Sequence, residues 1–345
     1  MTASPILGPG LQSKTDPHRH WKHTARLLAV LGVVYLAGSQ FHPGEIERAF
    51  ARLTPLTLIA VVLLLSPLAV LLRVLRWRRL LPGGKRLPLR SWIGAYLVGV
   101  MANSLLLGKF GDLAKARAIC DAELDYGQSL AVVAIDRLLE GMALLLAFTV
   151  VLLTSPLPGW AYRLAWIAGL ASVGVLVALW GLFHHRTSIL EGTERRLGWL
   201  PASLHRRVLG GAQRLLAGCE ALADYRRVLI ALLYSLGVWA VEIATVATFL
   251  AAFSAPCPRL AAAVMILIVL NFGLLVPVSP GSVGVYQLLC VFALSFWRVD
   301  PQLAFGLGVV MQIVLFVPLY LAGFVWLLVL IRSRGKNVTA QVLPS

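Results

Sequence analysis

The longest uncharged run of this chain, between Arg259 and Arg298, is interrupted at Asn271-Phe-Gly-Leu-Leu-Val-Pro-Val-Ser-Pro-Gly-Ser-Val-Gly-Val-Tyr-Gln287. The interruption holds two prolines and two glycines, Pro277, Pro280, Gly281 and Gly284. Each proline removes a backbone donor and clashes with the preceding helical turn, and the glycines loosen the chain further. Broken backbone persists in hydrocarbon only where protein or a wet cavity satisfies its polar groups. The simpler alternative is a proline kink in an ordinary membrane-spanning helix, but so many breakers exceed what a kink needs. We therefore favour a broken helix of the kind that marks substrate sites in transporters.

The composition of the chain predicts an all-α polytopic membrane protein. Of its 345 residues, 59% are hydrophobic and 13% are charged, and the mean hydropathy is +0.82. A soluble domain of this length needs far more polar surface. The formal net charge of +16 lies in basic clusters beside apolar runs, so we expect anionic lipid headgroups as partners and no nucleic acid.

The sequence offers no recognisable catalytic or metal-binding motif. The four cysteines are scattered without a CxxC pair, and the histidines have no carboxylate or cysteine at ligand spacing. A nucleophile elbow, an HExxH sequence, a P-loop and a dinucleotide fingerprint are all missing. We therefore expect no metal, no cofactor and no enzymatic activity.

The apolar periods predict about six full transmembrane helices and two interrupted runs. The expected crossings are residues 24–41, 56–73, 129–153, 161–183, 228–252 and 303–331, and the interrupted runs are 91–108 and 260–297. Residues 1–23 are expected to be a disordered cytoplasmic tail, 42–48 a mixed-charge loop and 332–345 a second cytoplasmic tail. The single transmembrane domain then extends over residues 24–331.

Two basic loops orient this domain. Residues 73–90 carry seven basic side chains and no acid, and residues 184–227 carry eight arginines against four acids. By the positive-inside rule both loops are cytoplasmic, the second as an amphipathic linker. Both chain termini are then cytoplasmic in a bacterial inner membrane.

The number of crossings between these loops predicts two re-entrant hairpins. Three full crossings between 90 and 184 would place the loops on opposite sides, so the run at 91–108 should enter and leave on one side. By the same argument 260–297 begins and ends outside. Asn103-Ser-Leu-Leu-Leu-Gly-Lys-Phe-Gly111 resembles the opening of the broken stretch, Asn271 to Gly281. This similarity suggests an inverted repeat of about 56–153 and 228–331, with a site near the midplane.

Charged side chains inside the predicted crossings are the candidate site residues. Asp136 and Glu140 are four residues apart and share a helix face, while Arg137 is three residues from Glu140. Glu242 lies near the middle of its own crossing. Such groups are costly in hydrocarbon and are usually paired or functional.

We hypothesise that Arg137, Lys109 and Lys115 contact a lipid phosphate while the acids hold these cations in place. The alternative is an internal set of salt bridges that only fixes packing. The predicted lipid-binding residues are Asn103, Lys109, Asp112, Lys115, Arg117, Asp136, Arg137, Glu140, Glu242, Asn271, Ser279, Pro280, Gly281, Gly284 and Gln287. Arg76, Trp77, Arg78 and Arg79 are predicted to lie at the headgroup level.

Four segments give the chain a family resemblance. They are Arg73-Val-Leu-Arg-Trp-Arg-Arg-Leu-Leu81, Gly108-Lys-Phe-Gly-Asp-Leu-Ala-Lys-Ala-Arg117, Asp136-Arg-Leu-Leu-Glu140 and Pro277-Val-Ser-Pro-Gly-Ser-Val-Gly-Val-Tyr-Gln287. With these segments the chain resembles the lysylphosphatidylglycerol synthase transmembrane family, the flippase-like domain of MprF proteins. The family usually has Glu at the positions of Asp112 and Gln287, and the second difference removes a charge. The sequence contains no aminoacyl-transferase domain, so the resemblance implies lipid translocation rather than lysyl transfer.

Three functions follow from these observations. The first is a flippase-like transporter that moves an anionic phospholipid or another lipid intermediate between leaflets. The second is an integral-membrane transferase, or an accessory subunit for one, in lipid or glycolipid synthesis. The third is a membrane anchor for a lipid-biosynthetic partner enzyme that docks on the 184–227 loop.

Overall fold

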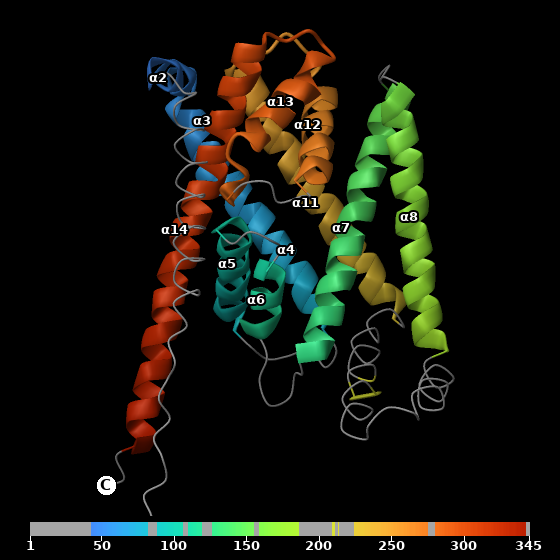
Figure 1. Ribbon diagram of the computed structural model, residues 1–345, viewed down its shortest axis with the longest axis vertical. Helices are drawn as coiled ribbons and strands as arrows, with labels where there is room; N and C mark the ends of the chain where they lie inside the picture. Colours follow the sequence, from blue (N-terminus) through green and yellow to red (C-terminus); the bar gives the residue numbers. More distant parts are fainter. Residues whose placement is uncertain are drawn as a thin grey trace, which may run out of the picture. The chain divides into compact units, whose positions relative to one another are not determined.

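The chain is an all-α membrane protein. The computed structural model describes residues 43–81, 88–105, 110–118, 126–154, 159–185, 209–210, 213, 224–274 and 280–342, and no strand occurs within these ranges. Its main elements are, in order, α2 (Pro43–Ala51), α3 (Pro55–Ile59), η1 (Ala60–Leu65), α4 (Ser66–Leu80), α5 (Leu89–Leu105), α6 (Phe110–Ala118), α7 (Tyr126–Thr154), α8 (Gly159–His184), α11 (Tyr225–Ala252), α12 (Arg259–Gly273), η3 (Pro280–Ser282), α13 (Val285–Ser295) and α14 (Pro301–Val342) (Figure 1). The expected tail at 1–23, the expected crossing at 24–41 and nearly all of the 184–227 linker lie outside the described residues.

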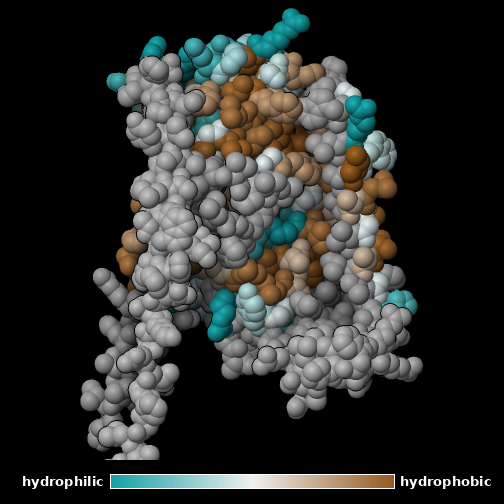
Figure 2. All heavy atoms as spheres, viewed as in Figure 1, coloured by the Kyte–Doolittle hydropathy of each residue, from teal (hydrophilic) through white to brown (hydrophobic). Residues whose placement is uncertain are grey.

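Long apolar helices make this a multi-pass membrane protein. In the part of the chain searched, three helical stretches are long and apolar enough to cross a bilayer: Pro55–Leu80, Tyr225–Ala252 and Pro301–Val329. The first runs through α3, η1 and α4 without interruption. Helices α7 and α8 are 29 and 26 residues long, so each is also long enough to span about 30 Å of hydrocarbon. Hydrophobic side chains cover much of the coloured surface in Figure 2, as a lipid-facing surface requires.

Two sequence expectations about helix boundaries need correction. The mixed-charge segment expected as a loop at 42–48 forms helix α2 from Pro43 to Ala51. A proline suits the first helical position because its missing N–H has no intrahelical partner there. At the other end of the chain, α14 continues beyond residue 331 to Val342, with Pro318 inside it.

Helix α12 is the buried centre of the bundle. Every residue from Ala261 to Leu270 is buried, so this helix has no polar face. A helix that is hydrophobic all round must be enclosed by others. Helices α7, α11 and α13 pack around it and cover its apolar side chains.

Two helical hairpins pack inside the bundle. Helices α5 and α6 contact each other so closely that a Cβ added to Gly111 would clash with the backbone oxygen of Gly99. Helices α12 and α13 form the second pair, in which Gly273 lies against the side chain of Leu289. Helix α5 also contacts η3, so the first hairpin reaches the interruption between α12 and α13.

The helix ends sort into two groups. Helices α4 and α11 run antiparallel. Arg76 contacts Ser235, whereas Arg73, three residues earlier on α4, contacts Glu242, seven residues later on α11. Helices α5 and α14 are also antiparallel, because Gly94 meets Trp326 while Leu97 meets Gly323. We call the end that holds Leu80, Leu89 and Tyr225 the basic end, because the two basic loops attach there.

The two hairpins open at different ends of the bundle. Helix α5 begins at the basic end, and α6 returns there, where the Ser129 hydroxyl of α7 donates to the carbonyl of Ala116 (3.1 Å). Helix α12 follows the far end of α11, and α13 leads to α14 at the same far end, where Gly306 lies against Ala49 of α2. The placement of these hairpins in a bilayer and the inverted repeat stay predictions.

Candidate functional site

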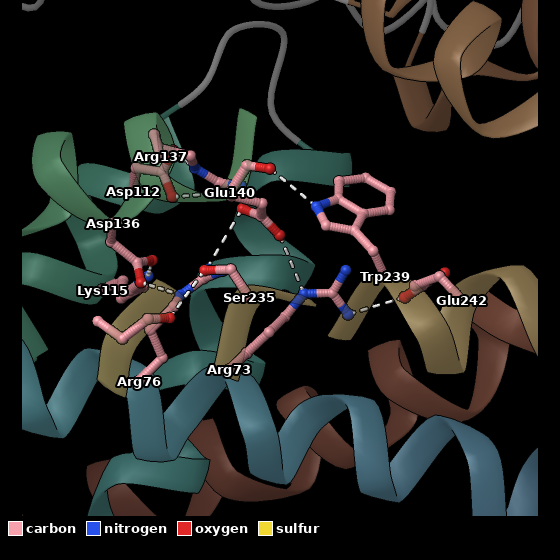
Figure 3. A network of polar contacts seen from close by, with 11 residues as sticks. Arg73, Arg76, Asp112, Lys115, Asp136, Arg137, Glu140, Ser235, Trp239 and Glu242 are labelled. Carbon is pink, nitrogen blue, oxygen red and sulfur yellow. Dashed lines mark hydrogen bonds and ion pairs between the residues drawn. The ribbon is translucent and has the colours of Figure 1, made fainter. Parts of the chain in front are cut away.

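Two arginines of α4 point into the helix bundle. Arg73 and Arg76 are three residues apart and therefore share a face of the helix. The Arg76 side chain is only 1% exposed, and its guanidinium donates to Asp136 Oδ1 (2.6 Å) and to Ser235 Oγ (3.0 Å). Figure 3 shows both arginines reaching from α4 toward acids of the neighbouring helices.

Arg76 and Trp77, which are predicted to lie at the headgroup level, are covered by other helices, and their depth in a bilayer stays a prediction. Both residues are buried, since α4 continues to Leu80 and packs this turn against α7 and α11. A buried guanidinium is tolerated because it is paired and hydrogen-bonded. Arg78 and Arg79 are exposed. With Arg227 they line a separate cavity of about 460 Å³ at the basic end.

Lys115 and Asp136 form the innermost part of the polar network. Lys115, on α6, donates to Asp136 Oδ2 (3.2 Å), so the two carboxylate oxygens of Asp136 bind two different cations. The Lys115 ammonium also lies 4.6 Å from the centre of the Trp77 ring, a cation–π distance. All three residues are buried. This part of the network therefore joins α4, α6 and α7 and is shielded from any ligand.

Glu140 and Glu242 hold Arg73 between α7 and α11. The Arg73 guanidinium donates through Nε to Glu140 Oε1 (3.2 Å) and through Nη1 to Glu242 Oε1 (2.8 Å). The Trp239 indole donates to the backbone oxygen of Glu140 (2.8 Å) and so fixes the α7 backbone at this point. The side chains of Arg73 and Glu242 are 18% and 22% exposed, so this part of the network meets a cavity.

Arg137 is the outermost cation of the network. It forms a bidentate pair with Asp112, through Nε to Oδ2 (3.0 Å) and Nη2 to Oδ1 (2.7 Å), and its Nη1 donates to Glu140 Oε2 (3.0 Å). Its side chain is nevertheless 50% exposed. A bidentate arginine is held in a defined orientation, so Arg137 combines a fixed geometry with an accessible face.

The charges of this network cancel. Arg73, Arg76, Lys115 and Arg137 supply four positive charges, and Asp112, Asp136, Glu140 and Glu242 supply four negative ones. Charges removed from water are stable only when paired in this manner. Exposure increases from Asp136 outward to Arg137. We therefore name the inner part, Arg76, Lys115 and Asp136, the buried triad, and regard the outer part as the candidate contact with a ligand.

A cavity of about 340 Å³ lies against the outer part of the network. Five predicted site residues line it together: Asn103, Arg137, Glu140, Glu242 and Asn271. Arg73 and Tyr96 add polar groups, and the remaining wall is largely apolar. Asp112 acts on the cavity through Arg137, whereas Lys115 and Asp136 lie behind it in the buried triad. We call this space the charged cavity.

The interruption between α12 and α13 is held by side-chain hydrogen bonds. Gly281 and Gly284 have φ angles of 63° and 85°, which favour glycine. Gln287 Oε1 accepts from the Gly284 amide (2.8 Å), and Gln287 Nε2 donates to Gln312 Oε1 (2.6 Å). Gln312 Nε2 donates in turn to the Gly281 carbonyl (2.6 Å). The buried Gln287 therefore holds the interruption in place, and with Gln312 it satisfies backbone polar groups that a broken helix leaves unpaired.

Of the remaining predicted site residues that the structure describes, Arg117 and Pro280 do not join this cluster. Lys109 and Ser279 lie outside the described residues. Arg117 is exposed on α6, and Pro280 begins the η3 turn. Asn103 has a structural role in addition to lining the cavity, because its Oδ1 accepts from the Gly111 amide (2.7 Å) and so joins α5 to α6.

The sequence prediction missed several residues of the site. Three of them, Arg73, Tyr96 and Trp239, line the charged cavity. Ser235 accepts a hydrogen bond from Arg76 of the buried triad, and Gln312 holds the interruption between α12 and α13. The spacing of Arg73 and Arg76 could have identified Arg73, since arginines three apart near the end of a crossing share one face. Periodicity offers no comparable indication for Ser235 or Gln312, whose polar partners come from distant segments.

Comparison with known proteins adds one match. The family model described as lysylphosphatidylglycerol synthase TM region matches residues 24–323. No curated protein and no solved structure matches the chain significantly. The matched residues include both hairpins and every described member of the charged network.

Proposed function

The chain belongs to the lysylphosphatidylglycerol synthase transmembrane family, and from that premise we propose that it moves a phospholipid between the leaflets of a bilayer. The family indicates a membrane protein of lipid metabolism or transport. The family is named for lysylphosphatidylglycerol, a phospholipid that shares its phosphate with the anionic phospholipids, and the cationic groups beside the cavity lead us to propose an anionic phospholipid as the substrate class. The charged cavity binds its polar head as the lipid crosses.

The observation that carries this proposal is the half-exposed Arg137 at the edge of the charged cavity. A guanidinium has five N–H groups, and the described contacts with Asp112 and Glu140 use three of them, one on each nitrogen. Two N–H groups thus remain for the oxygens of a phosphate. Asp112 and Glu140 hold the guanidinium still, so little side-chain entropy is lost when a headgroup binds.

The hairpins provide a route to this cavity from both leaflets in our proposal. Helices α6 and α13 have 9 and 11 residues. As α-helices they measure only about 13 and 16 Å, against about 30 Å of hydrocarbon. We propose that each hairpin turns back inside the bilayer, one from each face, and the contact of α5 with η3 supports a meeting of the two hairpins. A headgroup between them is shielded from hydrocarbon on both sides.

The orientation that we propose follows from the basic loops. With the basic end facing the cytoplasm, the loops attached to Leu80 and Tyr225 meet anionic headgroups, and both chain termini are cytoplasmic in a bacterial inner membrane. Membrane lipids are the partners, and a lipid-biosynthetic enzyme can supply the substrate. We propose a non-enzymatic protein that needs no cofactor.

Leaflet exchange by the purified protein tests this function. The protein is reconstituted into liposomes that contain fluorescent phosphatidylglycerol, and exchange is measured by the fraction of fluorophore that an external reductant can bleach. Arg137→Gln should reduce the rate of exchange by at least tenfold, because it removes the phosphate donor. Arg163→Gln, a change of an exposed arginine on α8 outside the predicted lipid-binding set, is the matched control and should leave the rate unchanged.

Two results would contradict the proposal. Wild-type protein that folds but shows no exchange above empty liposomes would refute translocation, and wild-type rates in Arg137→Gln would remove Arg137 from the mechanism. Product formation when a lipid acceptor and an activated donor are supplied would instead support the integral-membrane transferase.

A further inference from the structure

A second cavity lies beside the charged cavity and is almost entirely apolar. Its volume is about 280 Å³, and its walls come from the η1–α4 stretch, α5 and α14. The described side chains that line it are aliphatic apart from Ser66, and they include Val62, Leu71, Ile93, Leu97 and Ala322. A space of this chemistry does not suit a charged or hydrated group. We call it the apolar groove.

The two cavities adjoin each other. Ser66, Val70, Leu315 and Leu319 line both the apolar groove and the charged cavity. A ligand can therefore place a polar group beside Arg73 and Arg137 and an attached apolar group in the groove. A phospholipid has this combination of a charged head and hydrocarbon chains.

Exposed apolar side chains flank the groove. Pro67 and Pro318 line it from α4 and α14. A proline inside a helix removes one backbone hydrogen bond, and the turn before Pro67 is π-helical, from Ala60 to Leu65. The neighbouring side chains of Leu64 and Leu321 are 64% and 61% exposed. In the proposed function these side chains meet lipid, so the groove lies beside the hydrocarbon of the bilayer.

We propose that the apolar groove binds an acyl chain of the phospholipid whose head occupies the charged cavity. The lipid is then held at two adjoining subsites, and it reaches them sideways from the bilayer between α4 and α14. The inference rests on the proposed function for the identity of the lipid, but it concerns binding and not movement. The wall that the groove shares with the charged cavity is the reason for choosing a lipid chain over a segment of another protein.

The proposal predicts how affinity depends on chain length. The probes are water-soluble phosphatidylglycerols with acyl chains of increasing length, titrated into the purified protein at a fixed detergent concentration. Each methylene that enters an apolar site tightens binding by up to about fourfold. For the wild type, the dissociation constant should therefore fall steadily as the chain lengthens.

Two tryptophan substitutions separate the groove from the outer surface of the same helix. Ala322→Trp fills the groove, and it should abolish most of the dependence on chain length. Leu321→Trp is the matched control, because Leu321 is 61% exposed and does not line the groove; it should keep the wild-type dependence. Arg137→Gln should weaken binding of every probe by a similar factor and leave the dependence on length intact.

The outcomes are distinct for the two proposals. An unchanged chain-length dependence in Ala322→Trp would overturn the assignment of the groove. If that variant does not fold, Ile93→Trp fills the groove from α5 and carries the same expectation. Normal leaflet exchange together with an unchanged chain-length dependence in Ala322→Trp would refute only this inference. Binding that depends on acyl-chain length and is lost in Ala322→Trp, without any leaflet exchange, would refute only the proposed function.

Discussion

Replacement of Asp136 by asparagine should destabilise the protein severely. Asp136 is 3% exposed and pairs with Arg76 (2.6 Å) and Lys115 (3.2 Å), which are 1% and 4% exposed. Asp136→Asn keeps the shape of the side chain but leaves the two buried cations with one counter-charge fewer. Removal of one partner from a buried ion pair costs about 3–5 kcal/mol, because the remaining charge is uncompensated.

The buried triad also predicts a partial rescue. When Lys115→Met is added to Asp136→Asn, the formal charge of the network returns to zero, and a flexible apolar side chain occupies the space beside Trp77. Residues in one salt-bridge network couple by about 0.5–3 kcal/mol, so the double variant should be more stable than Asp136→Asn alone. A simple loss of packing would make the double variant worse.

Thermal unfolding in detergent measures both effects. The ten tryptophans provide an intrinsic fluorescence change, and Asp136→Asn should lower Tm by on the order of 10 °C. Asp112→Asn is the matched control, because Asp112 pairs with the half-exposed Arg137 and an exposed pair contributes about 0–1 kcal/mol. The reasoning is refuted if Asp136→Asn and Asp112→Asn melt at the same temperature, or if Lys115→Met provides no recovery.

Four further predictions follow from the hairpins and the loop between α11 and α12. Gly111→Ala should destabilise the protein by about 1–3 kcal/mol in the same melting assay, because the added Cβ meets the Gly99 backbone. Gly141→Ala, a glycine with open space around it, is the control and should be neutral or slightly stabilising. Equal effects of the two substitutions would disprove the close packing of α5 on α6. Gln312→Leu should lower the free energy of unfolding by about 1–3 kcal/mol, because it leaves the Gly281 carbonyl and the Gln287 amide without their described partner. Proteolysis at the α12–α13 interruption should then be faster than in the wild type. An unchanged rate of proteolysis would contradict this role of Gln312. In a variant whose other cysteines are replaced, Cys257 should react with an impermeant maleimide from the outer face of intact cells, and reaction from the cytoplasmic face alone would invert the proposed orientation. Burial raises the pKa of the Cys257 thiol, and Arg259 opposes this effect. The labelling rate of Cys257 should therefore rise at a higher pH than that of an exposed cysteine, because only the thiolate reacts. A pH dependence equal to that of an exposed-cysteine control would contradict the burial of Cys257.

Much of the architecture can be read from the sequence because a bilayer restricts it strongly. Apolar length alone indicates which segments form long helices, and the described helices α7, α8 and α11 begin and end within a few residues of the expected crossings. The proline and glycine cluster after Asn271 identifies the interruption before α13, since these residues cannot continue a regular helix. The spacing of Asp136 and Glu140 likewise places both acids on one face of α7.

The partners of these charges, by contrast, depend on how the helices pack. Helical periodicity tells which residues share a face, but it carries no information about the helix that this face meets. Arg73 pairs with Glu140 and with Glu242, which are 67 and 169 residues away in the chain. Arg76 and Trp77 lie in a basic, aromatic segment typical of the headgroup region, yet the packing of α4 against α7 and α11 buries them. The charges along the chain thus indicate that a polar site exists, while the neighbours of each helix determine which of these charges are buried as structural pairs and which remain accessible to a lipid.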